Sequence, residues 1–232
     1  MAQVVKENTT LQVDAKKEWV FLGILWGVVI LSFGLPFIIK GNSSIVFIPL
    51  LTLIVAGKFT WKPFIIIRGN MGERRVFEEL RLLPDNYHVL NDVTVKVDSN
   101  EAQIDHLILS PYGIWSIETK SHLGRIFGKE NDRNWTQKKK SDKGKIYTTT
   151  FYNPVAQNAV HCKRIGDFLN REIGMTIPVR SIVVFTSADQ LNIQTNTPVV
   201  TPKQLRQTIQ TIDRDNKVIT DDTIKKIIQA VS

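Results

Sequence analysis

The residues from 102 to 120 constrain the fold of this chain more than any other stretch. They form two apolar runs around residues 110–113, Ser-Pro-Tyr-Gly, in which proline presets the second turn position and glycine tolerates the fourth. This pattern predicts a β-hairpin, and counting outward from the turn places Asp105 directly opposite Glu118. The sequence therefore predicts two strands that carry a pair of opposed acids.

The two opposed acids need a compensating charge. Directly opposed positions hold their Cβ atoms ~5 Å apart, so two carboxylates there repel by roughly 3 kcal/mol at an effective dielectric of ~20. Lys120 follows Glu118 by two residues and therefore shares its face of the sheet. A divalent cation would neutralise the acids, and the lysine could orient or deprotonate a water that attacks a phosphodiester. The alternative is a salt bridge on a solvated face, but both strands are apolar on both faces, and buried acids point to function.

A helical pattern from residue 71 to residue 83 precedes these strands. Its apolar stripe consists of Val76, Phe77, Leu80 and Leu83. Glu73 falls on the same stripe at 100° per residue, so we expect it to face the sheet. An acid at such a position is often a snorkelling or capping residue.

A second helix is expected from residue 154 to about residue 170, because Asn153 provides an N-cap and Pro154 suits the first helical position. Gln157, His161 and Arg164 fall on the side opposite its apolar face. They could present three hydrogen-bonding groups to a ligand, although a solvated face explains His161 and Arg164 as well.

Several motifs follow one another in a fixed order. They are Gly72-Glu73 at a helix start, Ile104-Asp105-His106 on one strand, Glu118-Thr119-Lys120 on the next, Trp135, and Asn153-Pro154 with Gln157. In this order they resemble the nuclease-related domain (NERD) family, which is placed in the PD-(D/E)XK nuclease superfamily. The resemblance covers about residues 70–175 and says nothing about the first 65 residues. Ile104 stands where a proline often precedes the aspartate, and this departure leaves the acid in place.

The resemblance implies a restriction-endonuclease-like core, and the expected order of helix, three strands, helix and strand agrees with it. We therefore expect an α/β (α+β) fold with a mixed central sheet flanked by helices. The resemblance also implies Mg²⁺- or Mn²⁺-dependent cleavage of nucleic acid, with Asp105, Glu118 and Glu73 at the metal. Lys120 and Gln157 complete the expected catalytic set: the lysine positions the attacking water and the glutamine steadies the arrangement.

Two uncharged apolar runs precede the expected nuclease core. Residues 19–39 are 21 in number, and a helix of that length covers the ~30 Å hydrocarbon core of a bilayer. Residues 45–57 form a shorter run that Pro49 interrupts, and the segment of about residues 44–61 around it either spans as well or lies at the interface. A signal peptide is the alternative for the first run. We expect a transmembrane helical hairpin in the cytoplasmic membrane, and the basic residues on its outer flanks place the nuclease domain on the cytoplasmic side.

Residues 125–145 hold eight basic and three acidic residues, and thus five of the chain's eight net positive charges. They follow the strand that bears Glu118 and Lys120, so we expect them at the mouth of the site, where positive charge attracts phosphate backbones. A solvated loop is the alternative. Trp135 either stacks on a base or anchors this segment to the core. The candidate nucleic-acid-binding residues are Arg125, Lys138, Lys139, Lys140, Lys143 and Lys145.

Composition bounds the remaining possibilities. With 232 residues, 43% of them hydrophobic, the chain can hold one ordinary domain and a smaller segment. The single cysteine excludes an internal disulfide, and the four scattered histidines show no zinc spacing. We expect a cytoplasmic tail at residues 1–18, the anchor at 19–61, the nuclease-like core at 69–180, and strands and helices that complete the domain at 181–232.

The function expected from these features is that of a membrane-anchored nuclease, with DNA favoured over RNA as its substrate. Two other classes stay open. One is a catalytically silent, membrane-tethered module that binds nucleic acid or protein, and the other is a scaffold whose charge faces anionic lipid. The acids, lysine and glutamine favour the enzyme, because a binding module has no need of opposed acids beside a lysine.

Overall fold

The structure, a computed structural model, describes residues 1–6, 10–38, 47–59, 61–98, 100–141, 143–213 and 218–231. The chain divides into two compact units. One contains residues 1–8 together with residues 71–232, and the other contains residues 9–70. Every candidate catalytic and nucleic-acid-binding residue belongs to the first of these units.

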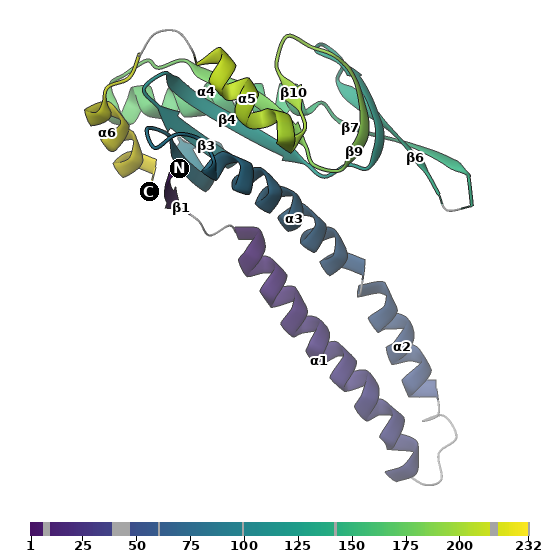
Figure 1. Cartoon of the computed structure of the whole chain (residues 1–232). Coiled ribbons are helices and arrows are strands. Elements are labelled where there is room, and N and C mark those ends of the chain that lie inside the picture. The colour runs from purple at the N-terminus through teal and green to yellow at the C-terminus, as the bar shows by residue number, and fades with distance from the viewer. Residues whose placement is uncertain are drawn as a thin grey trace. The chain divides into compact units, whose positions relative to one another are not determined.

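The unit of residues 9–70 is helical (Figure 1). It contains α1 (Thr10–Ile38), α2 (Phe47–Phe59) and the first part of α3 (Trp61–Arg81). The hydroxyl groups of Ser32 on α1 and Thr52 on α2 lie 3.0 Å apart. Helix α1 begins well before the expected apolar run, because the residues that precede this run include good helix formers such as Leu, Ala, Lys and Glu.

One helix among the described residues is long and apolar enough to cross a membrane. This stretch of α1 runs from Lys16 to Gly34, and α2 supplies a shorter apolar stretch from Phe47 to Gly57. The structure thus supports one candidate span and does not confirm the expected hairpin of two. The expected polar turn between the two segments lies outside the described residues.

The larger unit is built on a six-stranded mixed sheet in the order β1-β2-β3-β4-β8-β10. Its strands are β1 (Gln3–Lys6), β2 (His88–Val97), β3 (Asn100–Ser110), β4 (Gly113–Lys120), β8 (Val179–Phe185) and β10 (Val199–Val200). Strands β2, β3 and β4 form an antiparallel meander, and β1, β8 and β10 are added in parallel. The expected mixed α/β architecture is confirmed.

Helices cover both faces of this sheet (Figure 1). On one face, α4 (Pro154–Ile173) and α6 (Asp221–Val231) pack against side chains such as Leu107 of β3. On the other face, α3 and α5 (Pro202–Ile212) pack against side chains such as Ile108. Successive residues of β3 therefore enter different cores, which explains why the sequence of this strand is apolar on both faces.

The expected tail at residues 1–18 is wrong, because Gln3–Lys6 forms strand β1. It pairs in parallel with β2, and Gln3 lies opposite His88. The amide of Gln3 donates to the carbonyl of Tyr87 at 2.8 Å. Four residues with two exposed valines carry little signal of their own, so this strand depends on the free edge that β2 offers.

The hairpin forms with the expected turn and register. Leu109 lies opposite Ile114, and Gly113 adopts a φ of +144°, which suits glycine. The pairing extends outward to His106 opposite Ile117 and ends one position before the two acids.

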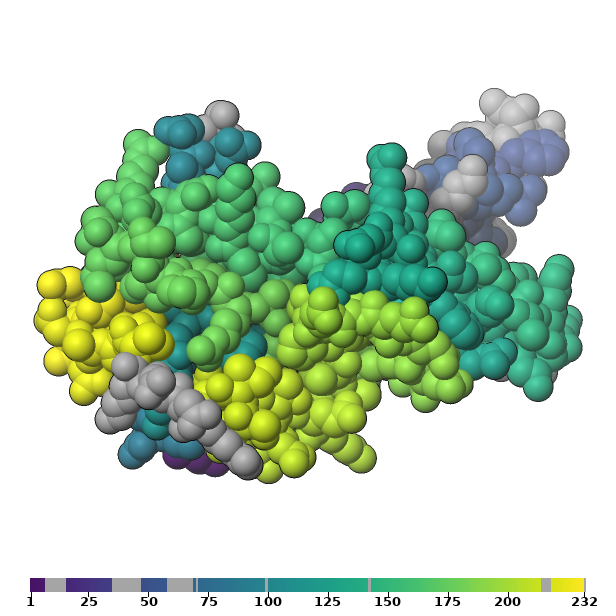
Figure 2. Space-filling view, turned by 90° about the horizontal axis from the view of Figure 1, so that it is seen from above, coloured from purple at the N-terminus to yellow at the C-terminus, as the bar shows by residue number. Residues whose placement is uncertain are grey.

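A second, four-stranded sheet projects from the domain (Figure 1). Its order is β7-β6-β5-β9, with β5 (Gly124–Lys129), β6 (Asn134–Lys140), β7 (Ile146–Tyr152) and β9 (Ala188–Gln194). The alternative of a solvated loop for residues 125–145 is therefore wrong, since β5 and β6 occupy most of that range. Figure 2 shows these strands at one end of the domain and α6 at the other.

Candidate active site

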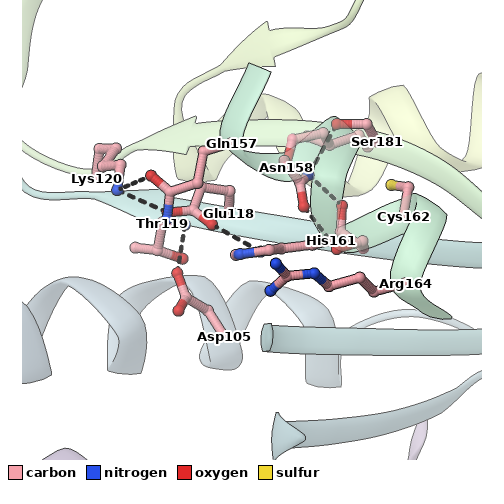
Figure 3. Close-up of polar contacts among 12 residues, drawn as sticks. Asp105, Glu118, Thr119, Lys120, Gln157, Asn158, His161, Cys162, Arg164 and Ser181 are labelled. Carbon is pink, nitrogen blue, oxygen red and sulfur yellow. Dashed lines mark hydrogen bonds and ion pairs between the residues drawn. The ribbon is translucent and has the colours of Figure 1, made fainter. Parts of the chain in front are cut away.

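Asp105 lies on β3, one residue beyond the part of this strand that pairs with β4. Its Oδ2 accepts a hydrogen bond of 2.7 Å from the backbone amide of Thr119 on β4 (Figure 3). The carboxylate thus takes the place of a backbone acceptor at the point where the ladder ends. This contact holds Asp105 beside Glu118, as the register predicted.

Glu118, Lys120 and Gln157 form a chain of polar contacts on the α4 side of the sheet. Glu118 is only 3% exposed, and its Oε1 lies 2.7 Å from the Nζ of Lys120. The same Nζ donates to Oε1 of Gln157 at 3.0 Å (Figure 3). The structure therefore brings the predicted glutamine directly to the predicted lysine.

The Asn-Pro motif positions Gln157 in the first turn of α4. Oδ1 of Asn153 caps the helix by accepting from the amides of Val155 at 2.9 Å and Ala156 at 3.3 Å. Its Nδ2 donates to the backbone oxygens of Glu130 and Asp132, both at 2.8 Å. One buried side chain thus ties the β5–β6 turn to the start of α4.

Asn158, which the sequence analysis did not single out, fixes the next turn of α4. It is fully buried, and its Oδ1 accepts from the hydroxyl of Ser116 at 2.6 Å. Its Nδ2 donates to the Ser116 carbonyl, the Ser181 hydroxyl and the Ile182 carbonyl at 2.8–3.1 Å. A polar residue next to Gln157 in a capped helix is the only sequence signal for this role.

His161 also belongs to the site, one turn after Gln157. Its Nδ1 lies 3.4 Å from Oε2 of Glu118, although the angles do not meet those of a hydrogen bond (Figure 3). The spacing of four residues placed His161 on the same helix face as Gln157, and the sequence left a ligand-facing role and a solvated face both open. Arg164 instead donates to the backbone oxygen of Glu101.

Glu73 faces the sheet from α3, as its helical phase predicted. Its neighbour Gly72 explains the close approach, because a Cβ there would lie 2.8 Å from Oγ1 of Thr186. The pKa of Glu73 is raised to about 7, first by burial and then by the charges of Asp92 and Glu118. The pKa value is consistent with a carboxyl group inside an acidic site.

Asp92 is an acid that the sequence analysis did not single out. It adopts a left-handed φ of +52° in β2, and its Oδ1 accepts a hydrogen bond of 2.5 Å from Gln103. Its backbone oxygen accepts from Nζ of Lys6, so the N-terminal strand reaches this side of the site. The Asn-Asp pair between the apolar residues Leu90 and Val93 was the available signal.

The acids of the site differ in protonation. Burial raises the pKa of Asp105 well above its usual value, and the charges of Glu118 and Glu73 raise it further. Burial also raises the pKa of Glu118, but contacts with His161 and Lys120 outweigh burial, so its pKa is lowered. The surroundings thus favour the ionised form of Glu118 and oppose ionisation of Asp105 and Glu73.

This donor set fits a hard divalent cation by its chemistry. Carboxylate oxygens are the ligands that Mg²⁺ and Mn²⁺ prefer. The pKa values of Asp105 and Glu73 are raised first by burial and then by repulsion from neighbouring acids, and a bound cation would relieve this repulsion. Within the described ranges, no group of three or more histidine, cysteine, aspartate or glutamate side chains is already arranged around one point. The side chains that could bind a metal ion are therefore present, but they are not already arranged in a coordination geometry.

The candidate nucleic-acid-binding residues lie on the second sheet and its turn rather than on one continuous surface. Strand alternation places Lys138 and Lys140 on the face of β6 opposite to that of Lys139. Lys138 pairs in register with Arg125 on β5 and holds its Nζ 5.1 Å from the Phe127 ring. Arg125 and the three lysines Lys138, Lys139 and Lys140 line a groove of about 330 Å³.

The side chain of Lys139 alternates to the other face of β6, and Lys145 directly precedes β7. Lys139 contributes to a lowered pKa of His122, whose main causes are burial and then the charge of Lys120. Nζ of Lys145 lies 5.4 Å from the ring of Tyr147, which pairs with Lys139. Lys143 lies in the β6–β7 turn.

Trp135 anchors the second sheet to the core. It is fully buried, stacks on Phe185 with a centroid distance of 6.2 Å, and donates from Nε1 to the Lys129 carbonyl at 3.0 Å. A Cβ on Gly128 would lie 2.4 Å from its ring. The interpretation of Trp135 as a packing residue is confirmed, and base stacking by this side chain is excluded by its burial.

Comparisons with known proteins identify the family of the part of the chain that holds this site. The nuclease-related domain family matches residues 68–186, about half of the chain. A protein of Bacillus anthracis, described as uncharacterized, is 34% identical over 133 residues, which cover 55% of this chain and 56% of that protein. The chain thus spans about half the length of this curated relative, and no solved structure matches it. Since the family match includes Glu73, the acidic hairpin and Gln157, the chain belongs to the nuclease-related domain family.

Proposed function

We propose that this protein is a membrane-anchored, Mg²⁺- or Mn²⁺-dependent nuclease of the PD-(D/E)XK superfamily that hydrolyses phosphodiester bonds, with DNA favoured over RNA. The observation that carries the proposal is the contact set of Glu118. This buried carboxylate lies 2.7 Å from Lys120 and 3.4 Å from His161, next to Asp105. A buried charge with several specific partners is typical of a catalytic centre.

Each residue of the set has a distinct role. Asp105, Glu118 and Glu73 would hold the divalent cation, Glu73 directly or through water. The bound cation would polarise the scissile phosphate and activate a water. Lys120 would position the attacking water, while Gln157 fixes the ammonium group through its 3.0 Å hydrogen bond. His161 would hold the second oxygen of Glu118 in place.

The alternative of a silent binding module explains the buried acids less well. Placing carboxylates with raised pKa values in a partly closed site lowers the stability of the fold. Exposed lysines alone would supply affinity for nucleic acid without that cost. A scaffold that faces lipid has the same difficulty, so the acids favour an enzyme.

The membrane anchor is supported by connectivity. Strand β1 precedes α1 in the chain but belongs to the same sheet as β2. If α1 crosses a bilayer, the chain must cross back before residue 71, because both ends belong to one domain. The apolar α2 is the segment available for this return.

The same pairing argues against a cleaved signal peptide, because cleavage after α1 would separate β1 from the sheet that it completes. We propose a hairpin anchor in the cytoplasmic membrane with the catalytic domain on the cytoplasmic side, where Lys16, Lys17 and Lys58 flank the apolar segments. A reporter fused after Arg68 should be active only on the cytoplasmic side. Activity of that fusion outside the membrane would show that the second segment does not cross.

The decisive experiment is a cleavage assay on the detergent-purified full chain, because a fragment that starts near residue 69 would lack β1. The parent should cleave DNA only when Mg²⁺ or Mn²⁺ is present. Lys120→Ala should lose cleavage by about 10²–10⁴-fold while it still binds Mn²⁺. A chain that binds neither metal and cleaves no single- or double-stranded nucleic acid would contradict the proposal.

A further inference from the structure

A cavity of about 780 Å³ lies beside the proposed site, among residues of α3, the end of β8, the start of β9 and the start of α5. Its apolar walls include Met71, Phe185, Ala188 and Pro202. This volume is typical of sites that enclose a small organic molecule or one unit of a polymer. The roles proposed above do not use this cavity.

Three cations line the same cavity, namely Arg74, Arg75 and Lys203. Within the part of the chain that the structure describes, none of the three forms an ion pair. Arg75 donates one hydrogen bond of 3.4 Å, to the backbone oxygen of Thr186. The three charges are therefore available to an anionic ligand, and arginine suits phosphate in particular.

Two acids also line the wall, and they limit the positive charge. Glu78 is paired with Arg81 at 3.4 Å, while Glu79 forms no ion pair among the described residues. Three cations against one unpaired acid suit a ligand with one or two phosphates. A long stretch of polyanionic backbone would require a more uniformly basic surface.

Thr186 links the cavity to the catalytic set. It lines the cavity, and its amide donates to the carbonyl of Lys120 at 2.9 Å. Lys120 is the last residue of β4. Beyond it, this strand no longer separates the α4 side of the sheet from the side of α3 and α5. A nucleotide that follows a phosphodiester at Lys120 is therefore within reach of the cavity.

We propose that this cavity binds one unpaired nucleotide of the nucleic-acid substrate, adjacent to the scissile phosphodiester. The inference rests on the proposed nuclease function. The base lies against the apolar side chains of Met71, Ala188 and Pro202, and a flanking phosphate lies against Arg74, Arg75 and Lys203. Apolar contact and arginine–phosphate contact are the two interactions by which proteins hold unpaired nucleotides without reading sequence.

The proposal has a consequence for substrate choice. A base inside a duplex is stacked and paired, and it enters such a cavity only after a loss of a few kcal/mol. A single strand, an overhang or a frayed end avoids that cost. The protein should therefore prefer single-stranded or end-frayed substrates to the interior of a duplex.

The test measures binding and does not depend on cleavage. Full-length Glu118→Gln protein in detergent, without divalent metal, is titrated with a fluorescent ten-nucleotide thymidine single strand and with a blunt duplex. Adding Arg74→Ala and Arg75→Ala should weaken single-strand binding about tenfold and reduce the slope of log affinity against log salt by about 1.4. Duplex affinity should change less than twofold.

Two further variants keep the result interpretable. Lys203→Ala removes a cavity charge that is carried by α5 rather than by α3 and should weaken single-strand binding severalfold. The control pair Arg206→Ala and Lys225→Ala removes the same number of exposed charges outside the cavity and should leave single-strand affinity within twofold of the background protein.

The outcomes separate this inference from the nuclease proposal. Equal losses in the cavity and control variants, or equal losses for single strand and duplex, would overturn the nucleotide site. The nucleotide site would also be overturned if the arginine variants lost affinity for short-chain anionic phospholipid but not for the oligonucleotide. If the arginine variants selectively lose single-strand binding while the parent protein never cleaves, the cavity assignment stands and only the nuclease proposal is refuted.

Discussion

The β3–β4 hairpin and the second sheet both carry charged residues, but they hold them in opposite ways. In the hairpin, Glu118 is 3% exposed and contacts two other site residues. On the second sheet, Lys138 and Lys140 are exposed, and no ion pair to either is found in the described part of the chain. Buried charges depend on one another and suit chemistry, whereas exposed charges act almost independently and suit affinity.

The largest expected effect is at the hairpin. Asp105→Asn and Glu118→Gln should each abolish detectable cleavage, because the cation loses a charged ligand. Without metal, Asp105→Asn should leave thermal stability unchanged or raised, since it relieves repulsion with Glu118 and Glu73. Cleavage assays and melting curves on the same preparations measure both effects. A structural salt bridge would instead predict a loss of ~3–5 kcal/mol when one buried partner is removed.

The cleavage activity of His161→Ala should lie between that of the parent and that of these acid variants. A residue that orients a metal ligand typically contributes 10- to 100-fold to activity or metal affinity. His161→Gln, which restores a polar group near Glu118, should recover part of the loss. If alanine and glutamine variants cleave like the parent, the 3.4 Å contact with Glu118 has no functional role.

Glu73 gives a pH-dependent effect on stability. Its pKa is raised from 4.5 to about 7, so the metal-free fold favours the protonated acid. The cost of ionising it appears as the pH rises from about 4.5 to about 7 and is complete above that range, reaching about 3 kcal/mol. Glu73→Gln removes this cost, so in EDTA the variant should be more stable than the parent at pH 8 and equal to it near pH 4.

Urea unfolding at pH 4 and pH 8 measures this difference. Glu79→Gln removes one negative charge from the same helix, away from the acidic site, and serves as the control. Added Mg²⁺ should then stabilise the parent more than the Glu73 variant. An unchanged difference between the two proteins at both pH values would show that Glu73 lies in a solvated position.

The smallest effects belong to the second sheet. Replacing Lys138, Lys139 and Lys140 with alanine should weaken nucleic-acid binding and reduce the salt slope by at most about 2.7 for duplex DNA. Stability should stay within about 0.5 kcal/mol of the parent, because exposed side chains contribute little to folding. Fluorescence anisotropy at several salt concentrations measures the slope. Identical binding at every concentration would mean that this surface is not used.

Strand alternation sharpens the last comparison. Lys138 and Lys140 share a face with Arg125, while Lys139 lies on the face of His122, whose pKa it helps to lower. If nucleic acid lies along the Arg125 face, the Lys138/Lys140 double variant should account for most of the triple effect. If the nucleic acid passes His122 instead, Lys139→Ala alone should account for most of the triple effect.

Local chemistry in the sequence predicted the hairpin and its acids. The turn residues and a period of two determine register, so Leu109 pairs with Ile114 as expected, and Glu118 meets Lys120 on one face. Helical phase correctly turned Glu73 toward the sheet, and the Asn-Pro cap placed Gln157 at the start of α4. These features depend on neighbours within a few residues, which a sequence pattern encodes directly.

Contacts between distant segments were decided only by the tertiary structure. Strand β1 forms because β2 offers an edge, and four residues at the N-terminus cannot specify a partner that lies over eighty positions away. The basic segment becomes two strands because β9 and the buried Trp135 give it a sheet to join and a core to cover. His161 reaches Glu118, and the cavity forms beside Thr186, only because α4, α3 and α5 pack on the two faces of one sheet, a geometry that no single element contains.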